Sequence, residues 1–207
     1  METYGQSAHL ESRTQQRVVR WPSTFTTVAL VVSLALNVIL SHKVRSVMHT
    51  DSPKVIERSL LPVGSQVEPI KATRLGGHQE VISYQNTSQQ PTVLYVFTPP
   101  CSWCARNLDN VKALVDKESD QYRFVGLSLS EEGLAQYTAK NDLHFPVYSG
   151  LSTEAKQAYK LSGTPQTIVV SPEGIVLKNW MGAYVGDQKS QLEAFFHVTL
   201  PGVRPAP

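Results

Sequence analysis

The segment Phe97-Thr98-Pro99-Pro100-Cys101-Ser102-Trp103-Cys104-Ala105-Arg106-Asn107 decides the interpretation of the whole chain. It includes the end of the nearly continuous apolar run Val93–Phe97, which is typical of a strand buried on both faces. It leads into Ser102–Lys117, where apolar residues recur at the spacing of a helix. Two prolines separate these patterns, so we expect the chain to leave a buried strand and to begin a helix at or just after Cys101.

The two cysteines lie where chemistry at sulfur is favoured. A thiol at a helix N-terminus faces free backbone N–H groups and the positive end of the helix dipole, which lower its pKa. The thiolate is the form of cysteine that attacks a disulfide. Because Cys104 follows Cys101 by about one helical turn, the second thiol lies within reach of the first. The pair can therefore attack a target disulfide through Cys101 and resolve the mixed disulfide through Cys104.

Two other interpretations of the cysteine pair stay open. Both residues could be structural, although their place at a strand-to-helix junction argues for redox chemistry. They could also be two ligands of a metal site, which would need further ligands from His78, His144 or His197. None of these histidines has the paired spacing of a metal site. We therefore predict a redox pair and no bound metal.

Length and composition exclude several classes of protein. The chain has 207 residues with only 2 cysteines, too few for a disulfide-stapled scaffold or a four-cysteine zinc site. The formal net charge of +2 leaves no basic excess to neutralise phosphates, so we predict no nucleic-acid partner. Apolar residues make up 41% of the chain, which is too many for a disordered protein.

The N-terminal part of the chain predicts one transmembrane helix ahead of the folded domain. The run Phe25–Leu40 has no charged residue, and a helix from Trp21 to Leu40 would be about 30 Å long, which matches a bilayer core. A cleaved signal peptide and a buried core helix are the alternatives. Arginines in the preceding tail favour a cytoplasmic N-terminus. We predict a tail at 1–20, an anchor at 21–41, a linker at 42–59, the domain at 60–200 and a loose tail at 201–207.

The pattern of the domain alternates between strands and helices. The predicted strands are Gln79–Tyr84, Pro91–Phe97, Arg123–Leu129, Phe145–Tyr148, Thr167–Val170 and Ile175–Trp180. The predicted helices are Ser102–Lys117, Glu131–Asn141, Thr153–Leu161 and Gln188–Val198. Acidic residues in the first turn of the second helix suit its dipole. The order predicts an α/β domain with helices on both faces of a central sheet.

The cysteine segment, together with Gly163-Thr164-Pro165-Gln166-Thr167, resembles the thioredoxin superfamily. The closer match is to its membrane-anchored, extracytoplasmic TlpA/ResA-like branch of redoxins, which are thiol-disulfide oxidoreductases. Three further segments carry this resemblance, namely Leu61–Val67, Phe145–Val147 and Val170–Val176. The similarity covers roughly Leu60 to Val198.

The resemblance implies a thioredoxin-like fold with a central mixed sheet flanked by helices. It also implies that Pro165 forms a cis-proline loop facing the disulfide, where the backbone of Thr164 could pair with a substrate strand. An ordinary proline at the start of a strand is the alternative. We expect Trp103 and Pro100 to contribute to substrate binding, although Trp103 could instead pack on the domain.

This chain departs from the family pattern beside the cysteines. Tyr95 occupies the position of the buried acid of thioredoxin, and Asn107 that of a glutamate in ResA-like proteins. Neither side chain can act as a general base for Cys104. Pro100 stands where a tryptophan usually precedes the first cysteine, and Ser102-Trp103 differs from the Gly-Pro of thioredoxin. We therefore expect slow or altered resolution chemistry.

The leading hypothesis is an extracytoplasmic enzyme that exchanges disulfides with protein substrates, and the resemblance favours reduction over oxidation. No glycine-rich phosphate loop or dinucleotide motif is present, so we predict no cofactor. Electrons would come from a membrane thiol reductant, with the chain held in the inner membrane by a single span and the domain in the periplasm. Cytochrome c maturation and general disulfide reduction are both compatible with the resemblance.

Two alternative functions are kept. Thr98-x-x-Cys101 could serve a peroxiredoxin-like peroxidase, but Leu94 replaces the proline expected before that threonine. A copper or haem-assembly metallochaperone is the second alternative, because soft thiolates suit Cu(I).

Overall fold

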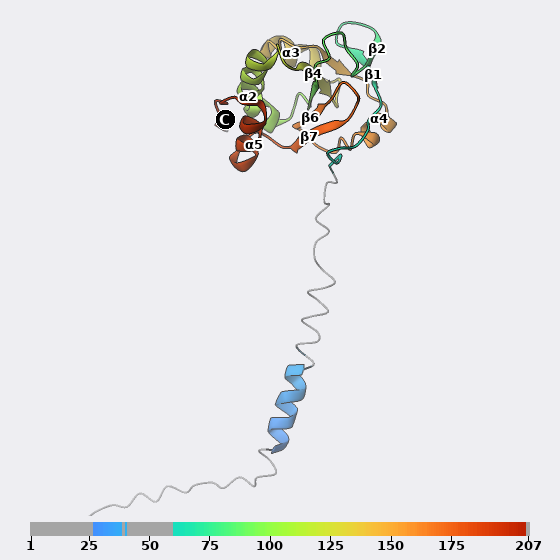
Figure 1. Cartoon of the computed structure of the whole chain (residues 1–207). Coiled ribbons are helices and arrows are strands. Elements are labelled where there is room, and N and C mark those ends of the chain that lie inside the picture. The colour runs from blue at the N-terminus through green and yellow to red at the C-terminus, as the bar shows by residue number, and fades with distance from the viewer. Residues whose placement is uncertain (1–26, 39, 41–59, 206–207) are drawn as a thin grey trace, which may run out of the picture. The chain divides into compact units, whose positions relative to one another are not determined.

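The structure is a computed structural model that describes residues 27–38, 40 and 60–205 (Figure 1). Contacts divide the chain into two units, Met1–Val55 and Ile56–Pro207. In the first unit, the described residues 27–38 and 40 are helical, and their apolar side chains are exposed. Among the described residues, no helix combines the length and the hydropathy needed to cross a bilayer. The tail at 1–20, the linker at 42–59 and part of the anchor at 21–41 lie outside these residues, so the anchor stays a prediction.

The second unit is built on one mixed sheet of seven strands in the order β2-β1-β5-β4-β3-β6-β7. β3 lies inside the sheet, parallel to β4 and antiparallel to β6. All six of its residues are buried, which explains the unbroken apolar run in the sequence. The strands are β1 (Ile70–Arg74), β2 (Gln79–Ile82), β3 (Thr92–Phe97), β4 (Arg123–Ser128), β5 (Val147–Ser149), β6 (Gln166–Val170) and β7 (Val176–Met181).

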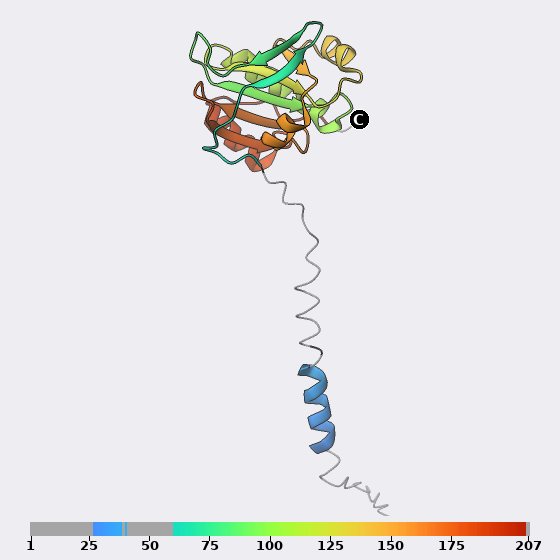
Figure 2. The same cartoon turned by 90° about the vertical axis from the view of Figure 1, so that its right-hand side faces the viewer.

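Helices flank the sheet (Figure 2), and three of them pack apolar side chains against one of its faces. Alternate residues of β3 enter two separate apolar clusters. One cluster holds Val93, Tyr95 and Phe97 together with side chains of three helices, and the other holds Leu94 and Val96 together with residues that follow the fourth helix. The three helices of the first cluster are α2 (Ser102–Glu118), α3 (Leu134–Asn141) and α5 (Gly186–Phe196). The fourth helix, which precedes residues of the other cluster, is α4 (Thr153–Ala158).

One strand and the starts of two helices differ notably from the sequence prediction, and most other bounds shift by one to three residues. The strand β1 was not predicted, because its sequence Ile-Lys-Ala-Thr-Arg has only two apolar residues and its pairing with β2 and β5 is a tertiary feature. The helix α3 begins at Leu134 rather than at Glu131, since Gly133 has a φ of 67° that interrupts the helical conformation. Its first turn therefore has no acidic residue, and that part of the prediction was wrong. The helix α5 begins two residues before Gln188.

The segment before β1 pairs with the hairpin that joins β6 to β7. Gln66 and Ile175 form an isolated antiparallel bridge, and the backbone N–H of Val67 donates to the carbonyl of Gly174 at 2.8 Å. Gly174 has a φ of 82°, and a Cβ there would lie 2.8 Å from the carbonyl oxygen of Val67. The close approach of these two chain segments therefore requires glycine at this turn.

The described residues beyond α5 are bound to the domain, unlike the loose tail predicted for 201–207. We call Leu200–Arg204 the C-terminal strap. Leu200 is buried, and the backbone N–H of Gly202 donates to the Asn110 side-chain oxygen at 2.7 Å. The backbone N–H of Arg204 donates to the carbonyl of Arg106 at 2.8 Å. The domain therefore extends to at least Arg204 rather than ending at residue 200.

Candidate redox site

Cys101 and Cys104 form a disulfide at the N-terminus of α2. Cys101 is the N-cap residue, and its sulfur accepts a hydrogen bond from the backbone N–H of Cys104 at 3.0 Å. Cys101 is partly exposed, whereas Cys104 is fully buried. A partner approaching from solution therefore reaches the sulfur of Cys101 first. In the reduced form the same N–H would stabilise a thiolate on Cys101 more than a thiol.

The turn between β3 and α2 places the disulfide at the carboxyl end of a central strand. The strand ends at Phe97, and the backbone N–H of Cys101 then donates to the carbonyl of Thr98 at 3.1 Å. The two prolines of this turn supply no backbone donor, so they extend neither the strand pairing nor the helix. The first helical hydrogen bond runs from the N–H of Ala105 to the carbonyl of Cys101 at 3.1 Å. The predicted junction of strand and helix is confirmed.

The predicted cis-proline loop lies beside this turn. The Thr164–Pro165 peptide bond is cis, as expected. Val96 of β3 is paired with Gln166 of β6, so the residues before β6 lie next to those after β3. Accordingly, the hydroxyl oxygens of Thr98 and Thr164 are 3.4 Å apart.

A groove of about 340 Å³ lies between the cis-proline loop and the first turn of α2. Trp103, Thr164 and Pro165, three of the residues predicted to bind substrate, all line it, and we call them its first wall. The Trp103 side chain is 46% exposed, so it is available to a ligand. Pro100 is also exposed but is not among the lining residues. The rest of the lining is Met181, Gly182, Ala183, Val185 and Gln188.

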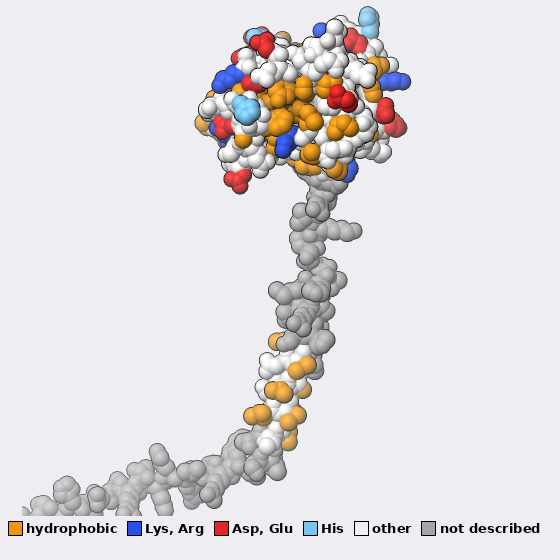
Figure 3. Space-filling view, in the orientation of Figure 1, with side chains coloured by type: hydrophobic (Ala, Val, Ile, Leu, Met, Phe, Trp, Pro, Cys, Tyr) orange, Lys and Arg blue, Asp and Glu red, His pale blue; other side chains and the backbone are white. Residues whose placement is uncertain are grey.

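Sequence reasoning missed the second wall of this groove. Its residues come from the end of β7, the loop to α5 and the first turn of α5, and the pairing of β6 with β7 brings them beside Pro165. The backbone N–H of Gly182 donates to the carbonyl of Pro165 at 2.7 Å, which joins the two loops. The exposed Val185 gives this wall an apolar surface. Hydrophobic side chains also gather in the middle of the domain face that lies over β6 and β7 (Figure 3).

The buried surroundings of Cys104 contain a phenol and amides in place of a carboxylate. Tyr95 belongs to the same apolar cluster as Cys104, and its hydroxyl has no hydrogen-bond partner among the described residues. Burial, followed by the neighbouring Tyr184 and Tyr137, raises the pKa of Tyr95 well above its ordinary value. Asn107 is fully buried, and its side-chain oxygen accepts from the backbone N–H of Tyr184 at 2.9 Å. These groups are uncharged near neutral pH, so neither can take a proton from Cys104 as a carboxylate would.

No metal site accompanies the cysteines in the part of the chain that the structure describes, since no three His, Cys, Asp or Glu side chains there gather closely enough to hold an ion. Of the histidines considered as ligands, His144 contacts Asp142 at 2.8 Å on the surface.

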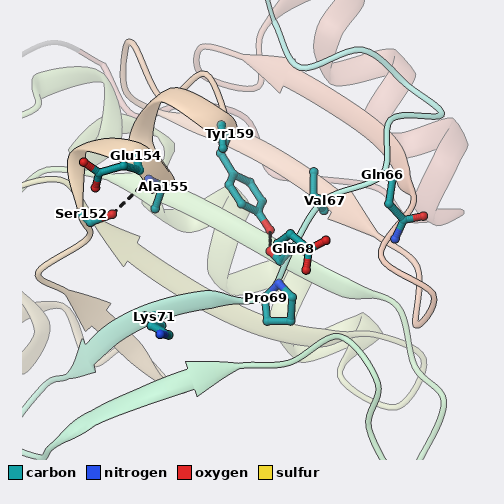
Figure 4. Close-up of a pocket in the computed structure, with 10 residues that line it drawn as sticks. Gln66, Val67, Glu68, Pro69, Lys71, Ser152, Glu154, Ala155 and Tyr159 are labelled. Carbon is teal, nitrogen blue, oxygen red and sulfur yellow. Dashed lines mark hydrogen bonds between the residues drawn. The ribbon is translucent and has the colours of Figure 1, made fainter.

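A second cavity of about 380 Å³ lies between α4 and the segment before β1 (Figure 4). The Tyr159 hydroxyl points into this region and donates to the carbonyl of Glu68. The Ser152 hydroxyl, at the N-terminus of α4, accepts from the backbone N–H of Ala155 at 3.2 Å. This cavity shares no lining residue with the groove. Only the groove includes a residue of the Cys101–Cys104 segment, Trp103, so the groove is the one that adjoins the redox pair.

Comparisons with known proteins agree with this geometry. The model of the AhpC/TSA family matches residues 63–179, which is more than half of the chain. No curated protein sequence matches this chain significantly.

Several solved structures share the fold at low sequence identity. The thioredoxin domain of a thiol-disulfide oxidoreductase from Bacteroides vulgatus has a TM-score of 0.53 at 19% identity, covering 66% of this chain and 99% of its own. A protein described as the thiol:disulfide interchange protein DsbE from Chlorobium tepidum has a TM-score of 0.57 at 16% identity, covering 66% and 97%. A thiol:disulfide interchange protein from Bacteroides sp. has a TM-score of 0.51 at 18% identity, covering 66% and 91%. The domain therefore has the thioredoxin-like fold.

Proposed function

The chain belongs to the AhpC/TSA family and is an oxidoreductase, and we propose that it acts by thiol-disulfide exchange with protein substrates outside the cytoplasm. The observation that carries this proposal is the unequal exposure of the two cysteines in one disulfide. Cys101 is accessible at the N-terminus of α2 beside an apolar groove, and Cys104 is buried one turn later. This arrangement suits an attacking thiol and an internal resolving thiol.

The reaction proceeds in two exchanges. The Cys101 thiolate attacks one sulfur of a substrate disulfide, forms a mixed disulfide and releases the other substrate sulfur as a thiolate, which takes a proton from solvent. Cys104, after losing its proton, attacks the Cys101 sulfur and releases the second substrate sulfur. The substrate disulfide is reduced by two electrons, and the Cys101–Cys104 dithiol becomes the disulfide seen in the structure. A partner dithiol must then reduce that disulfide for another turnover.

We infer that the net direction is reduction, with a membrane thiol reductant as the electron donor. The apolar run Phe25–Leu40 supports a single inner-membrane span with the domain in the periplasm. Structures with the same fold include proteins named as thiol:disulfide interchange proteins, which supports protein disulfides as substrates. Trp103, Thr164 and Pro165 would contact the substrate in the groove, and Pro100 would contact it beside Cys101.

Trapping the intermediate tests the roles of the two thiols. The Cys104→Ser protein should accumulate a mixed disulfide with an insulin chain through Cys101, because the resolving thiol is absent. Non-reducing electrophoresis and mass spectrometry detect the adduct, and Cys101→Ser serves as the matched control that should form none. If wild type reduces insulin while Cys104→Ser forms no adduct, the two roles are assigned incorrectly.

Two assays separate this proposal from the alternative functions. Rapid consumption of hydrogen peroxide that is lost in Cys101→Ser would favour a peroxidase. Stoichiometric copper retained after purification and lost in Cys101→Ala would favour a metallochaperone.

A further inference from the structure

The C-terminal strap makes hydrogen bonds to the first part of α2, where Trp103 lines the groove. The backbone N–H of Arg204 donates to the carbonyl of Arg106 at 2.8 Å, and Nε of Arg106 donates back to the carbonyl of Arg204 at 2.8 Å. The guanidinium of Arg204 also holds Asp109 through two hydrogen bonds, one of them 2.6 Å from Nε. This hydrogen bond from Arg204 lowers the pKa of Asp109. Paired bonds of this kind fix orientation as well as distance.

Through Arg106 the strap reaches the first wall of the groove. The guanidinium carbon of Arg106 lies 4.2 Å from the centre of the Trp103 ring, in a cation–π contact. Trp103 is 46% exposed, so solvent reaches a large part of this residue. Because Nε of Arg106 is bound to the strap, the guanidinium is held in place over that ring.

Through Asn110 the strap reaches the second wall. The backbone N–H of Gly202 donates to the Asn110 side-chain oxygen at 2.7 Å, and the Asn110 amide donates to the Asn107 oxygen at 3.0 Å. That oxygen also accepts from the backbone N–H of Tyr184 at 2.9 Å. Both asparagines are fully buried, so water cannot replace these bonds. Tyr184 lies between Ala183 and Val185, which line the groove.

The chain at the start of the strap is bound to α5 and α2 by contacts that do not involve the groove. Leu200 is 3% exposed, and its backbone N–H donates to the Glu193 carboxylate at 2.7 Å. The Lys117 ammonium donates to the carbonyl of Thr199 at 2.7 Å. The strap is therefore held against both α2 and α5 before it reaches Arg106.

From these contacts we propose that the C-terminal strap keeps both walls of the groove in the arrangement that binds a polypeptide, with Arg106 and Arg204 as positioning residues for Trp103. The inference rests on the proposed exchange of protein disulfides. A polypeptide needs the preformed groove, whereas a small disulfide needs only access to the Cys101 sulfur. The strap therefore determines selectivity for protein substrates over small disulfides, without taking part in the chemistry.

The test compares two substrates in the full-length chain. We expect Arg204→Ala and Arg106→Ala to lower kcat/KM for insulin reduction about fivefold, the typical effect of losing one charge-assisted or cation–π contact. The rate with the small disulfide 5,5′-dithiobis(2-nitrobenzoate) should change less than about twofold, since it reports access to the sulfur. The matched control is His144→Ala, which removes an exposed hydrogen bond with Asp142 that does not involve the strap.

Fluorescence supplies a readout that does not depend on turnover. Acrylamide quenching of Trp103 should increase in Arg204→Ala, because the ring loses its restrained partner. The Trp103 signal is obtained by subtracting the matched Trp103→Phe proteins, since the chain has 3 tryptophans. Equal losses with insulin and with the small disulfide, or unchanged quenching of Trp103, would overturn the proposal. If wild type reduces neither substrate, the proposed function fails, and quenching still decides whether the strap restrains Trp103.

Discussion

At the scale of single residues, Asn107 connects elements that the sequence separates. Its one side-chain oxygen accepts from the backbone of Tyr184 and from the amide of Asn110, and all three groups are buried. Position 107 also lies about one turn after Cys104 in α2. Asn107 therefore fixes the loop after β7 and, at the same time, leaves no carboxylate at that position. The local structure and the slow resolution expected of Cys104 thus depend on the same residue.

Removing this oxygen should destabilise the domain. Asn107→Ala leaves two buried donors unpaired, so we expect a loss of about 2 to 4 kcal/mol in the free energy of unfolding. Urea unfolding followed by circular dichroism measures it. Asn141→Ala is the control, because its amide makes a single bond to the carbonyl of Tyr137 at a partly exposed site, where water can replace it. Equal losses in the two variants would show that Asn107 has no special structural role.

At the scale of secondary-structure elements, the sequence predicted those with a strong local pattern. The buried strand β3 and the helix α2 follow from an apolar run and from helical spacing, and together they place Cys101 correctly. The strand β1 has too few apolar residues to be recognised before its partners are known. The place of the cysteines was accessible to sequence reasoning for the same local reason, whereas the cis-proline was predicted from the resemblance to the thioredoxin superfamily. The wall from Gly182 to Val185 was not predicted, because only the pairing of β6 with β7 brings it to Pro165.

The hairpin between β6 and β7 gives a matched pair of glycine substitutions. Gly174→Ala should lower the free energy of unfolding by about 2 to 4 kcal/mol, through left-handed strain and contact with the carbonyl of Val67. Gly64 has a similar φ of 86° with nothing within 4 Å of an added Cβ. Gly64→Ala should therefore cost only the strain, about 1 kcal/mol. Thermal and urea unfolding compare the two, and equal costs would contradict the packing argument.

At the scale of the whole molecule, the sheet order brings residues from four regions of the chain to one end of β3. The disulfide, the cis-proline loop, the loop after β7 and the strap are separated in sequence by up to about a hundred positions, yet hydrogen bonds connect them. The predicted anchor would give this domain a fixed location. The described helical residues 27–38 and 40 belong to the other unit of the chain.

Membrane anchoring can be checked in a bacterial host. We expect the full-length chain to sediment with membranes and to resist carbonate extraction, because the run Phe25–Leu40 has the length and composition of a span. Protease added to the periplasm should digest the domain. Replacing Leu30 and Leu34 by arginine should release the chain from the membrane, since charges at the centre of a span are costly. Recovery of the unmodified chain in the soluble fraction would contradict the anchor.

The N-cap of α2 has a thermodynamic consequence for the electrons that the protein can deliver. The Cys101 sulfur terminates the helix by accepting from the backbone of Cys104, so the helix favours whichever redox form places more negative charge on that sulfur. Free energy that α2 contributes to the thiolate lowers the energy of the reduced form and raises the reduction potential, by about 30 mV for each 1.4 kcal/mol in a two-electron couple. A firmer cap makes Cys101 easier to ionise and the dithiol a weaker donor. Reactivity and reducing power therefore oppose one another at this single hydrogen bond.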